Sequence, residues 1–314
     1  MKLIITGALG HIGSYTLKHL PERFPECEIV LLDNLLTQRF SSLFDLPDAD
    51  YRFHAVNVLD KGLETYLEGA AAVINLAAIT DAAGSFGNAE EVEHNNFNAT
   101  QSVAQACIKT NVPLIHLSST SVYGTASDTV DEDCSDDDLN PQSPYAECKL
   151  KEEKLLQRLG KEQDLNFIVC RFGTICGPSA GMRFHTAVNK FCWQAVMNEK
   201  ITVWKTALHQ KRPYLTLTDA FQAFVFILEN KLFDRQIYNV LTDNLTVNNI
   251  LEMIGTHVKD PEIEFVDTEI MNQLSYEVLN TKFKDQSFSN SGSIEQAIAE
   301  TIQLLGGIKN SHGG

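Results

Sequence analysis

The sequence predicts an α/β protein: a doubly wound parallel sheet with a smaller mixed α/β region. Two observations lead to this prediction. In the first half of the 314-residue chain, nearly continuous apolar segments of strand length alternate with segments of helical periodicity. Strands that are apolar on both faces are typical of a parallel sheet covered by helices. In addition, the first apolar segment runs directly into three glycines with the spacing G-x-x-G-x-x-G, which are Gly7, Gly10 and Gly13.

The glycine segment lies between a predicted strand over residues 2–6 and a helix expected from Ser14. A strand, a glycine turn and a helix N-terminus form a cradle for the pyrophosphate of a dinucleotide. Gly7 would permit the tight turn, Gly10 the close approach of backbone to phosphate, and Gly13 the close packing of helix on strand. Because glycines also serve ordinary turns, the alternative is a βαβ unit that binds no ligand.

A carboxylate at the end of the second strand supports the ligand-binding interpretation. Residues 28–32 are predicted to form a strand whose last four residues are apolar, and Asp33 follows it, twenty residues after Gly13. There a carboxylate can accept hydrogen bonds from the adenosine ribose, which predicts a Rossmann unit. Asp33 would repel the 2′-phosphate of NADP, and the only cation nearby is Arg39. NAD is therefore the expected cofactor.

The remaining elements of the first half continue the alternation. Four more apolar segments predict strands over residues 51–56, 71–76, 112–117 and 166–171. Helices are expected over residues 90–109 and 145–159, the second between Pro144 and Gly160 as start and stop signals. An acidic loop covers residues 127–138.

The second half mixes smaller elements after a Gly/Pro cluster at residues 177–181. The pattern predicts helices over 186–198, 219–228 (capped by Asp219), 247–257 and 293–305, and strands over 201–204, 214–217 and 236–240. We expect two domains. The Rossmann domain comprises residues 1–173 plus about 213–242, and a smaller mixed α/β domain comprises about 174–212 plus 243–309. Residues 310–314 carry no packing signal and are expected to be a flexible tail.

Composition excludes several classes of function. The longest apolar stretches have strand length, so no membrane-spanning helix is expected, and the N-terminus lacks a signal-peptide pattern. The seven cysteines are scattered without C-x-x-C spacing, which indicates reduced thiols in a cytoplasmic protein and no metal site. A net charge of −16 argues against a general binder of nucleic acid or of anionic membranes.

Candidate catalytic residues follow the fifth strand. Tyr145 and Lys149 are four residues apart and would share one face of a helix. An ammonium placed there lowers the pKa of the phenol, which can then act as a general acid or base on a sugar hydroxyl. Ser119 ends the strand before them, where ligands bind in such sheets. The alternatives are an exposed helix pair for Tyr145 and Lys149, and capping by side-chain oxygens for residues 118–121.

Together these segments resemble the extended short-chain dehydrogenases/reductases of the NAD-dependent epimerase/dehydratase family. The resemblance spans nearly the whole chain, and its motifs occur in family order. They are the glycine turn, Asp33-Asn34, 76–78, 95–100, 118–124, Tyr145-x-x-x-Lys149, 171–173 with Gly177-Pro178, and 212–214.

The resemblance implies a role for each matching position. NAD would be held by Gly7, Gly10, His11, Ile12, Gly13, Asp33, Asn34, Asn57, Val58, Leu76, Ala77, Ala78, Asn96, Tyr145 and Lys149. Tyr145 would be the catalytic acid/base, Lys149 would bind the nicotinamide ribose, and Ser119 would be the catalytic hydroxyl, with Thr120 as the near alternative. A nucleotide-diphosphate sugar would contact Thr80, Ser119, Thr120, Thr174, Arg183, Trp204 and Arg212.

The reaction expected from the resemblance is 4-epimerisation. Dehydratases of the family carry an Asp-Glu pair directly after the catalytic hydroxyl, and related decarboxylases keep the Glu. Here those positions are Thr120 and Ser121, which cannot act as carboxylate bases. Transient oxidation at C4 with return of the hydride needs neither carboxylate. The alternatives are a C4 dehydrogenase or reductase, then a 4,6-dehydratase or decarboxylase, and lastly a non-catalytic dinucleotide-sensing protein.

Two departures make the substrate pocket specific to this chain. Thr174 stands where epimerases usually have an Asn, and Cys176 where an aromatic is common. Asn57 likewise replaces the usual Asp near the adenine. The resemblance also implies a homodimer formed through the helices at about 90–109 and 145–159.

Overall fold

The computed structural model describes residues 1–80, 89–124, 128–267 and 275–307. The predicted tail at 310–314 lies outside these residues. The doubly wound parallel sheet is confirmed: seven strands pair in the order β11-β7-β5-β4-β1-β2-β3, and every pair is parallel. The strands are β1 (Lys2–Thr6), β2 (Glu28–Asp33), β3 (Asp50–Ala55), β4 (Ala72–Asn75), β5 (Leu114–Ser119), β7 (Phe167–Phe172) and β11 (Ile237–Val240). The strand order reverses between β1 and β4, where such sheets bind ligands.

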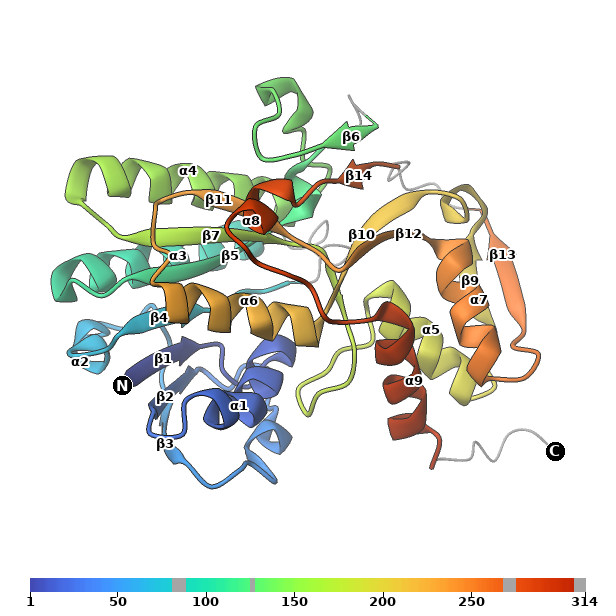
Figure 1. The fold of residues 1–314 in the computed structure, drawn as a ribbon, viewed down its shortest axis with the longest axis horizontal. Coiled ribbons are helices and arrows are strands. Elements are labelled where there is room, and N and C mark those ends of the chain that lie inside the picture. The colour runs from blue at the N-terminus through green and yellow to red at the C-terminus, as the bar shows by residue number, and fades with distance from the viewer. Residues whose placement is uncertain (81–88, 125–127, 268–274, 308–314) are drawn as a thin grey trace.

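Helices pack on both faces of this sheet (Figure 1). One face carries α1 (His11–Arg23) and α6 (Leu217–Asn230), whose Leu17, Leu20 and Phe224 are fully buried with the strand residues Ile5 and Leu31. The other face carries the short α2 (Glu64–Leu67), α3 (Ala89–Thr110) and α4 (Pro144–Gln163). Because both faces are covered, the inner strands of the sheet are nearly continuous apolar runs, whereas the edge strand β3 is largely exposed and carries polar residues.

A second group of elements lies at the end of the molecule away from the N-terminus (Figure 1). A three-stranded sheet has the order β12-β10-β8, and two small parallel pairs join β9 with β13 and β6 with β14. The strands are β6 (Thr129–Val130), β8 (Thr174–Cys176), β9 (Ile201–Trp204), β10 (Lys211–Thr216), β12 (Asp243–Thr246), β13 (Ile263–Val266) and β14 (Glu277–Val278). The helices are α5 (Ala187–Val196), α7 (Val247–His257) and α9 (Ile294–Leu305). The short α8 (Thr281–Asp285) packs instead on the large sheet at β11, and its Phe283 is part of that core.

The pairing of β10 and β11 can be compared with the expected boundary between the Rossmann domain and the smaller domain. β11 joins the large sheet, whereas β10 pairs in the three-stranded sheet, although the expected division places its residues from 213 with the Rossmann domain. The division itself stays a prediction. Among the described residues, no helix is both long and apolar enough to cross a membrane.

Two of the predicted helix boundaries are wrong. The helix predicted to end before Gly160, α4, continues to Gln163 and ends at Asp164, whose left-handed conformation has a φ of 59°. Gly160 serves close packing instead, because a Cβ there would lie 2.8 Å from the Phe167 ring. Likewise Asp219 does not cap α6. Thr216 caps it, and the buried Asp219 accepts hydrogen bonds from the backbone of a distant loop, at Ser291 and Gly292.

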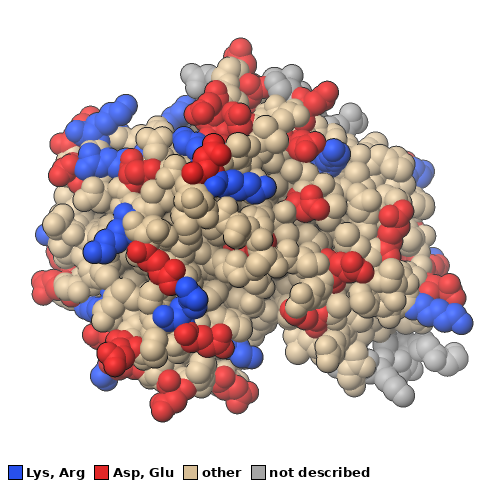
Figure 2. All heavy atoms as spheres, viewed as in Figure 1, with Lys and Arg blue, Asp and Glu red and all other residues tan. Residues whose placement is uncertain are grey.

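Charge on the surface is mixed. On the face shown in Figure 2, lysines and arginines stand among acidic side chains, and acidic side chains gather at the top, over the loop that carries β6. This face offers no continuous basic surface of the kind that binds nucleic acid.

Candidate active site

The glycine turn between β1 and α1 has the geometry of a phosphate cradle. Gly7 has a φ of +61°, and a Cβ there would lie 2.7 Å from the Leu76 carbonyl oxygen. A Cβ at Gly13 would lie 2.3 Å from the Ala8 carbonyl oxygen, so only glycine lets α1 pack this closely on the turn. Gly10 is the N-cap of α1, and no side chain caps the helix there. The first N–H groups of α1 can therefore serve an anionic ligand, and the segment fits the pyrophosphate of NAD.

Asp33 is held beside this turn by two backbone groups. Its Oδ2 accepts a hydrogen bond from the Leu9 N–H (3.0 Å), and its Oδ1 accepts one from the Leu35 N–H (2.9 Å). The carboxylate thus stands at the end of β2 next to the glycine turn. Arg39 donates to the Gly181 carbonyl oxygen (2.8 Å). The one cation near Asp33 in sequence is thus tied to the Gly/Pro cluster.

His11 joins the turn to the Gly/Pro cluster at residues 177–181. Its Nε2 lies 2.9 Å from the Gly177 carbonyl oxygen, which can only accept, so Nε2 carries a proton. Burial lowers the pKa of His11 to about 4, so the ring is neutral near pH 7. Ser14 and Ser179 add further bonds across the same contact, including one from the Gly181 N–H to the Ser14 Oγ (2.9 Å).

The turn after β4 is fixed from behind by an amide. Asn96 on α3 accepts from the Ile79 N–H and donates to the Ile79 carbonyl oxygen, each at 2.8 Å. This pair of bonds holds the backbone directly after Ala77 and Ala78. Thr80 follows, and its buried hydroxyl has no hydrogen-bond partner among the residues that the structure describes. A buried hydroxyl without a partner is a ready contact for a ligand.

The end of β5 and the turn after it carry four hydroxyls, at residues 118–121, and those of Ser119 and Thr120 have different surroundings. The Ser119 Oγ accepts from the Ser121 N–H (3.1 Å) and from the Ser121 hydroxyl (2.9 Å), and it caps the short 3-10 turn over residues 120–122. The Thr120 hydroxyl instead turns into the core, where it donates to the Phe172 carbonyl oxygen (3.3 Å). Ser119 is partly exposed, whereas Thr120 is buried.

Tyr145 lies in the first turn of α4, after Ser143, whose hydroxyl caps the helix by accepting from the Ala146 N–H (3.2 Å). The Lys149 ammonium lies 5.8 Å from the centre of the Tyr145 ring. Burial raises the pKa of Tyr145, and Lys149 acts in the opposite direction. Lys149 therefore favours a lower pKa of Tyr145, as expected. Burial has the larger effect, so the pKa of Tyr145 is above its usual value.

Lys149 has two buried neighbours that the sequence did not reveal. Its Nζ lies 2.9 Å from the Glu152 Oε2, and the His116 Nε2 lies 3.0 Å from the same oxygen. All three side chains are buried. The available signals were a carboxylate three residues after Lys149 and a histidine inside an apolar strand, and neither is specific by itself.

The predicted substrate residues come from both halves of the chain. The charge of Arg183 acts on both Tyr145 and His11, and in each case it favours a lower pKa. Arg212 lies over the ring of Tyr276, 5.6 Å from its centre, and Tyr276 donates to the Thr120 carbonyl oxygen (3.1 Å). Tyr276 is a further residue that the sequence did not reveal. Trp204 is 40% exposed on β9.

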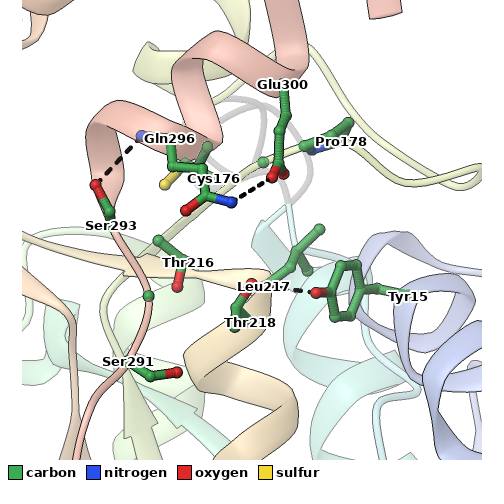
Figure 3. A pocket seen from close by; sticks show the side chains of 13 residues that line it. Tyr15, Cys176, Pro178, Thr216, Leu217, Thr218, Ser291, Ser293, Gln296 and Glu300 are labelled. Carbon is green, nitrogen blue, oxygen red and sulfur yellow. Dashed lines mark hydrogen bonds between the residues drawn. The ribbon is translucent and has the colours of Figure 1, made fainter. Parts of the chain in front are cut away.

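A cleft separate from these residues lies between α1, α6 and α9 (Figure 3). Its volume is about 220 Å³, and its walls include Tyr15, Thr218, Gln296 and Glu300. The Tyr15 phenol pairs with the Thr218 hydroxyl (3.1 Å), and the Gln296 amide donates to Glu300 (2.8 Å). Cys176, Gly177 and Pro178 of the family motifs also line this cleft, but none of the residues predicted to contact NAD or the nucleotide sugar does.

Comparison with known proteins finds one matching family model and several relatives of similar sequence. The model of the NAD dependent epimerase/dehydratase family matches residues 3–240. A trifunctional UDP-glucose 4,6-dehydratase/UDP-4-keto-6-deoxy-D-glucose 3,5-epimerase/UDP-4-keto-L-rhamnose-reductase of Arabidopsis thaliana is 28% identical over 96% of this chain, which spans about half (46%) of that relative's length. A dTDP-D-glucose 4,6-dehydratase of Dictyostelium discoideum is 28% identical over 77% of this chain and 58% of its own.

Solved structures share the fold at low sequence identity. The UDP-glucuronic acid 4-epimerase of Bacillus cereus, in complex with UDP-glucuronic acid and NAD, has a TM-score of 0.84 at 24% identity and covers 97% of this chain and 99% of its own. The UDP-N-acetylglucosamine 4-epimerase of Methanobrevibacter ruminantium has a TM-score of 0.83 at 22% identity and covers 96% and 97%.

Proposed function

The chain belongs to the NAD dependent epimerase/dehydratase family, and on that premise we propose that it is an NAD-dependent nucleotide-sugar 4-epimerase. The observation that carries this proposal is the set of side chains at the end of β5. Ser119, Thr120 and Ser121 lie there, and α4, which carries Tyr145 and Lys149, packs against this strand and the turn that follows it. This set can move one proton at one sugar oxygen. It offers no carboxylate at the two positions where a dehydratase needs its acid and base.

The residues divide into a cofactor side and a proton-transfer side. The glycine turn and the N-terminus of α1 would hold the pyrophosphate of NAD, and Asp33 the adenosine ribose. When bound, NAD supplies the acceptor and donor of the C4 hydride. Tyr145 would take the proton of the C4 hydroxyl and later return it. The Ser119 hydroxyl would bond the same oxygen, and we favour Ser119 over Thr120 because the Thr120 hydroxyl is directed into the core.

Two arginines suit a nucleotide diphosphate. Arg212 from β10 and Arg183 from the segment before α5 can each offer a planar fork of N–H groups to phosphate oxygens. Tyr276 orients Arg212 by stacking under its guanidinium. Thr80 would use its unpartnered hydroxyl toward the bound ligands. These contacts support UDP-, GDP-, CDP- and dTDP-sugars as the substrate class.

A second candidate is a 4,6-dehydratase, because the Arabidopsis and Dictyostelium relatives carry that name in full or in part. The hydroxyls at residues 120 and 121 argue against it. A C4 dehydrogenase or reductase would use the same residues as an epimerase. The dehydrogenase would release the 4-keto sugar and leave NADH, and the reductase would consume a 4-keto sugar together with NADH. A non-catalytic NAD-sensing protein fits least, because it would not need the pairing of Tyr145 with Lys149.

One experiment separates these reactions. The purified protein is incubated with NAD and each of the four nucleotide-sugar classes, and the products are resolved by mass and by NMR. A 4-epimerase yields an isomer of unchanged mass with no net NADH. Loss of water or carbon dioxide would contradict the proposal, and so would accumulation of NADH with a 4-keto product.

The expected homodimer through α3 and α4 stays a prediction. Light scattering of the purified protein measures it directly.

A further inference from the structure

A row of buried polar side chains crosses the large sheet. Thr6 on β1, Asn75 on β4 and His116 on β5 are register partners on adjacent strands. Two residues earlier in each strand, on the same face, stand Ile4, Val73 and Leu114, which belong to the apolar core under α3 and α4. The polar row is thus embedded in a core that is otherwise apolar, and each of its three side chains is at most 3% exposed.

The row forms a continuous chain of hydrogen bonds. The Ala77 N–H donates to the Thr6 hydroxyl (3.3 Å), which donates to the Asn75 Oδ1 (2.6 Å). The Asn75 amide nitrogen lies 3.3 Å from the His116 Nδ1. An amide nitrogen can only donate, so the His116 Nδ1 accepts, and the proton of the neutral ring is on Nε2. That Nε2 donates to the Glu152 Oε2 (3.0 Å).

The chain ends on the predicted catalytic lysine. The Glu152 Oε2 also accepts from the Lys149 ammonium (2.9 Å), and its Oε1 accepts from the Cys148 thiol (3.3 Å). Both oxygens of the carboxylate are therefore in use. The titratable groups with the largest effect on Lys149 are Tyr145, Cys148 and Glu152 on α4, and Lys149 also interacts with His116 on β5. The titratable groups that act on His116 are Lys149, Glu152 and Glu153.

Stability alone does not account for this arrangement. Apolar side chains of similar volume often serve stability as well as a buried ion pair does, or better. The row connects the backbone of Ala77, which would line the cofactor, with Lys149, which would bind the nicotinamide ribose. It therefore joins two points of one predicted site through the interior of the sheet.

We propose that this row positions Lys149, with Glu152 and His116 as positioning residues that hold the ammonium in place and keep it charged in a buried site. The inference rests on the proposed function only for what Lys149 does during turnover. Burial disfavours the ammonium, and the Glu152 carboxylate opposes that effect and raises the pKa of Lys149. Without the carboxylate, Lys149 would lose its proton at a lower pH.

The test compares Glu152→Gln with Glu153→Gln in the full-length protein. Gln keeps the shape and the acceptor oxygen of Glu152 but removes its charge. Glu153 is the matched control, because it is the next residue on α4, is equally buried and pairs with Arg171 (2.7 Å). The affinity for NAD is measured by calorimetry from pH 6 to pH 9, with thermal unfolding recorded at each pH.

We expect Glu152→Gln to bind NAD about 10- to 100-fold more weakly at the alkaline end, the size expected for a lost bond to a charged group. The deficit grows with pH, because Lys149 then deprotonates within this range. Glu153→Gln lowers thermal stability but keeps the wild-type dependence of NAD affinity on pH. The proposal is overturned if Glu152→Gln shows the wild-type pH dependence, or if both variants show the same altered one.

A second measurement uses the wild-type protein and needs neither variant to fold. Nitrogen-15 NMR of the histidine rings should show His116 as the neutral Nε2–H tautomer, without titration between pH 5 and pH 8. Titration in that range, or a proton on Nδ1, would overturn the proposal. Neither experiment contains a sugar, so both results stand if no epimerisation is found.

Discussion

The Tyr276 phenol oxygen lies 3.1 Å from the Thr120 carbonyl oxygen, although the two residues are 156 positions apart in the sequence. This bond joins the segment before β14 to the turn that begins at Ser119. The same tyrosine lies under the Arg212 guanidinium. One buried side chain therefore contacts both the turn of the predicted catalytic hydroxyl and the arginine proposed for the diphosphate.

Tyr276→Phe tests this link. Removing the hydroxyl leaves the Thr120 carbonyl without this donor, so we expect a loss of about 1 kcal/mol in the free energy of unfolding and a lower kcat, because the Ser119 turn is less well held. Urea unfolding and steady-state kinetics measure the two effects. Tyr15→Phe is the control, since it removes the hydroxyl that pairs with Thr218 in the separate cleft. An equal fall of kcat in both variants would contradict the role given to Tyr276.

Tyr145→Phe should abolish turnover and preserve NAD binding. The phenol is the proposed acid and base, and its loss should lower kcat by about 10²- to 10⁴-fold. The ring and Lys149 remain, so the cofactor cleft keeps its shape. Calorimetric titration with NAD and NMR detection of the epimerised sugar check the two parts. Tyr66→Phe, the same change on α2, should leave both unchanged. A Tyr145→Phe variant that turns over normally would remove Tyr145 from the mechanism.

Three glycines, Gly13 and Gly10 at the glycine turn and Gly255 on α7, should differ in how well they tolerate replacement by alanine. Gly13→Ala places a methyl group 2.3 Å from a backbone oxygen, and we expect a loss of about 1–3 kcal/mol in stability together with weaker NAD binding. At Gly10 the nearest atom is 3.2 Å away, so stability should fall less while NAD binding still weakens. Gly255 on α7 has no atom within 4 Å, and Gly255→Ala should raise stability by about 0.5–1 kcal/mol. Thermal unfolding and NAD titration of the three variants test this order. If Gly13→Ala were as stable as the wild type, the packing of α1 on the glycine turn would be less tight than the structure indicates.

Glu152 should make stability sensitive to acid. Burial opposes its ionisation, but Lys149 and His116 together lower its pKa from 4.5 to about 2. A carboxylate whose pKa is lower in the folded state stabilises the fold above its unfolded pKa, and this contribution is lost as the pH falls toward about 2. The contribution is on the order of 3 kcal/mol.

Urea unfolding at pH 7, 4.5 and 3 measures this effect. The difference between the wild type and Glu152→Gln should be largest at pH 7 and should shrink as the pH falls. Glu93→Gln removes an exposed carboxylate that pairs with Lys151 and should change little at any pH. A constant difference between wild type and Glu152→Gln would mean that the carboxylate titrates normally.

The sequence by itself determined the parts of this protein that depend on local pattern. Apolar runs located the inner strands of the large sheet because both faces of those strands are buried, whereas the edge strand β3 is largely exposed. The glycine turn was predictable because Gly7 and Gly13 occupy positions that a side chain cannot enter. The placement of Tyr145 and Lys149 on one helix face was predictable from their spacing, because one helix carries both residues.

Only the tertiary structure decided which distant groups complete the site. His116 and Glu152 meet at Lys149 because α4 packs across β5, and nothing in the local sequence encodes that crossing. Asp219 and Gly160 both matched helix-boundary signals in the sequence. In the structure the Asp219 carboxylate instead accepts a hydrogen bond from a loop 72 residues away. Gly160 lies inside the helix, where the Phe167 ring leaves no room for a side chain. Helix and strand periods report which face of an element is buried. They do not report which polar groups meet there, because that depends on how separate elements are packed together.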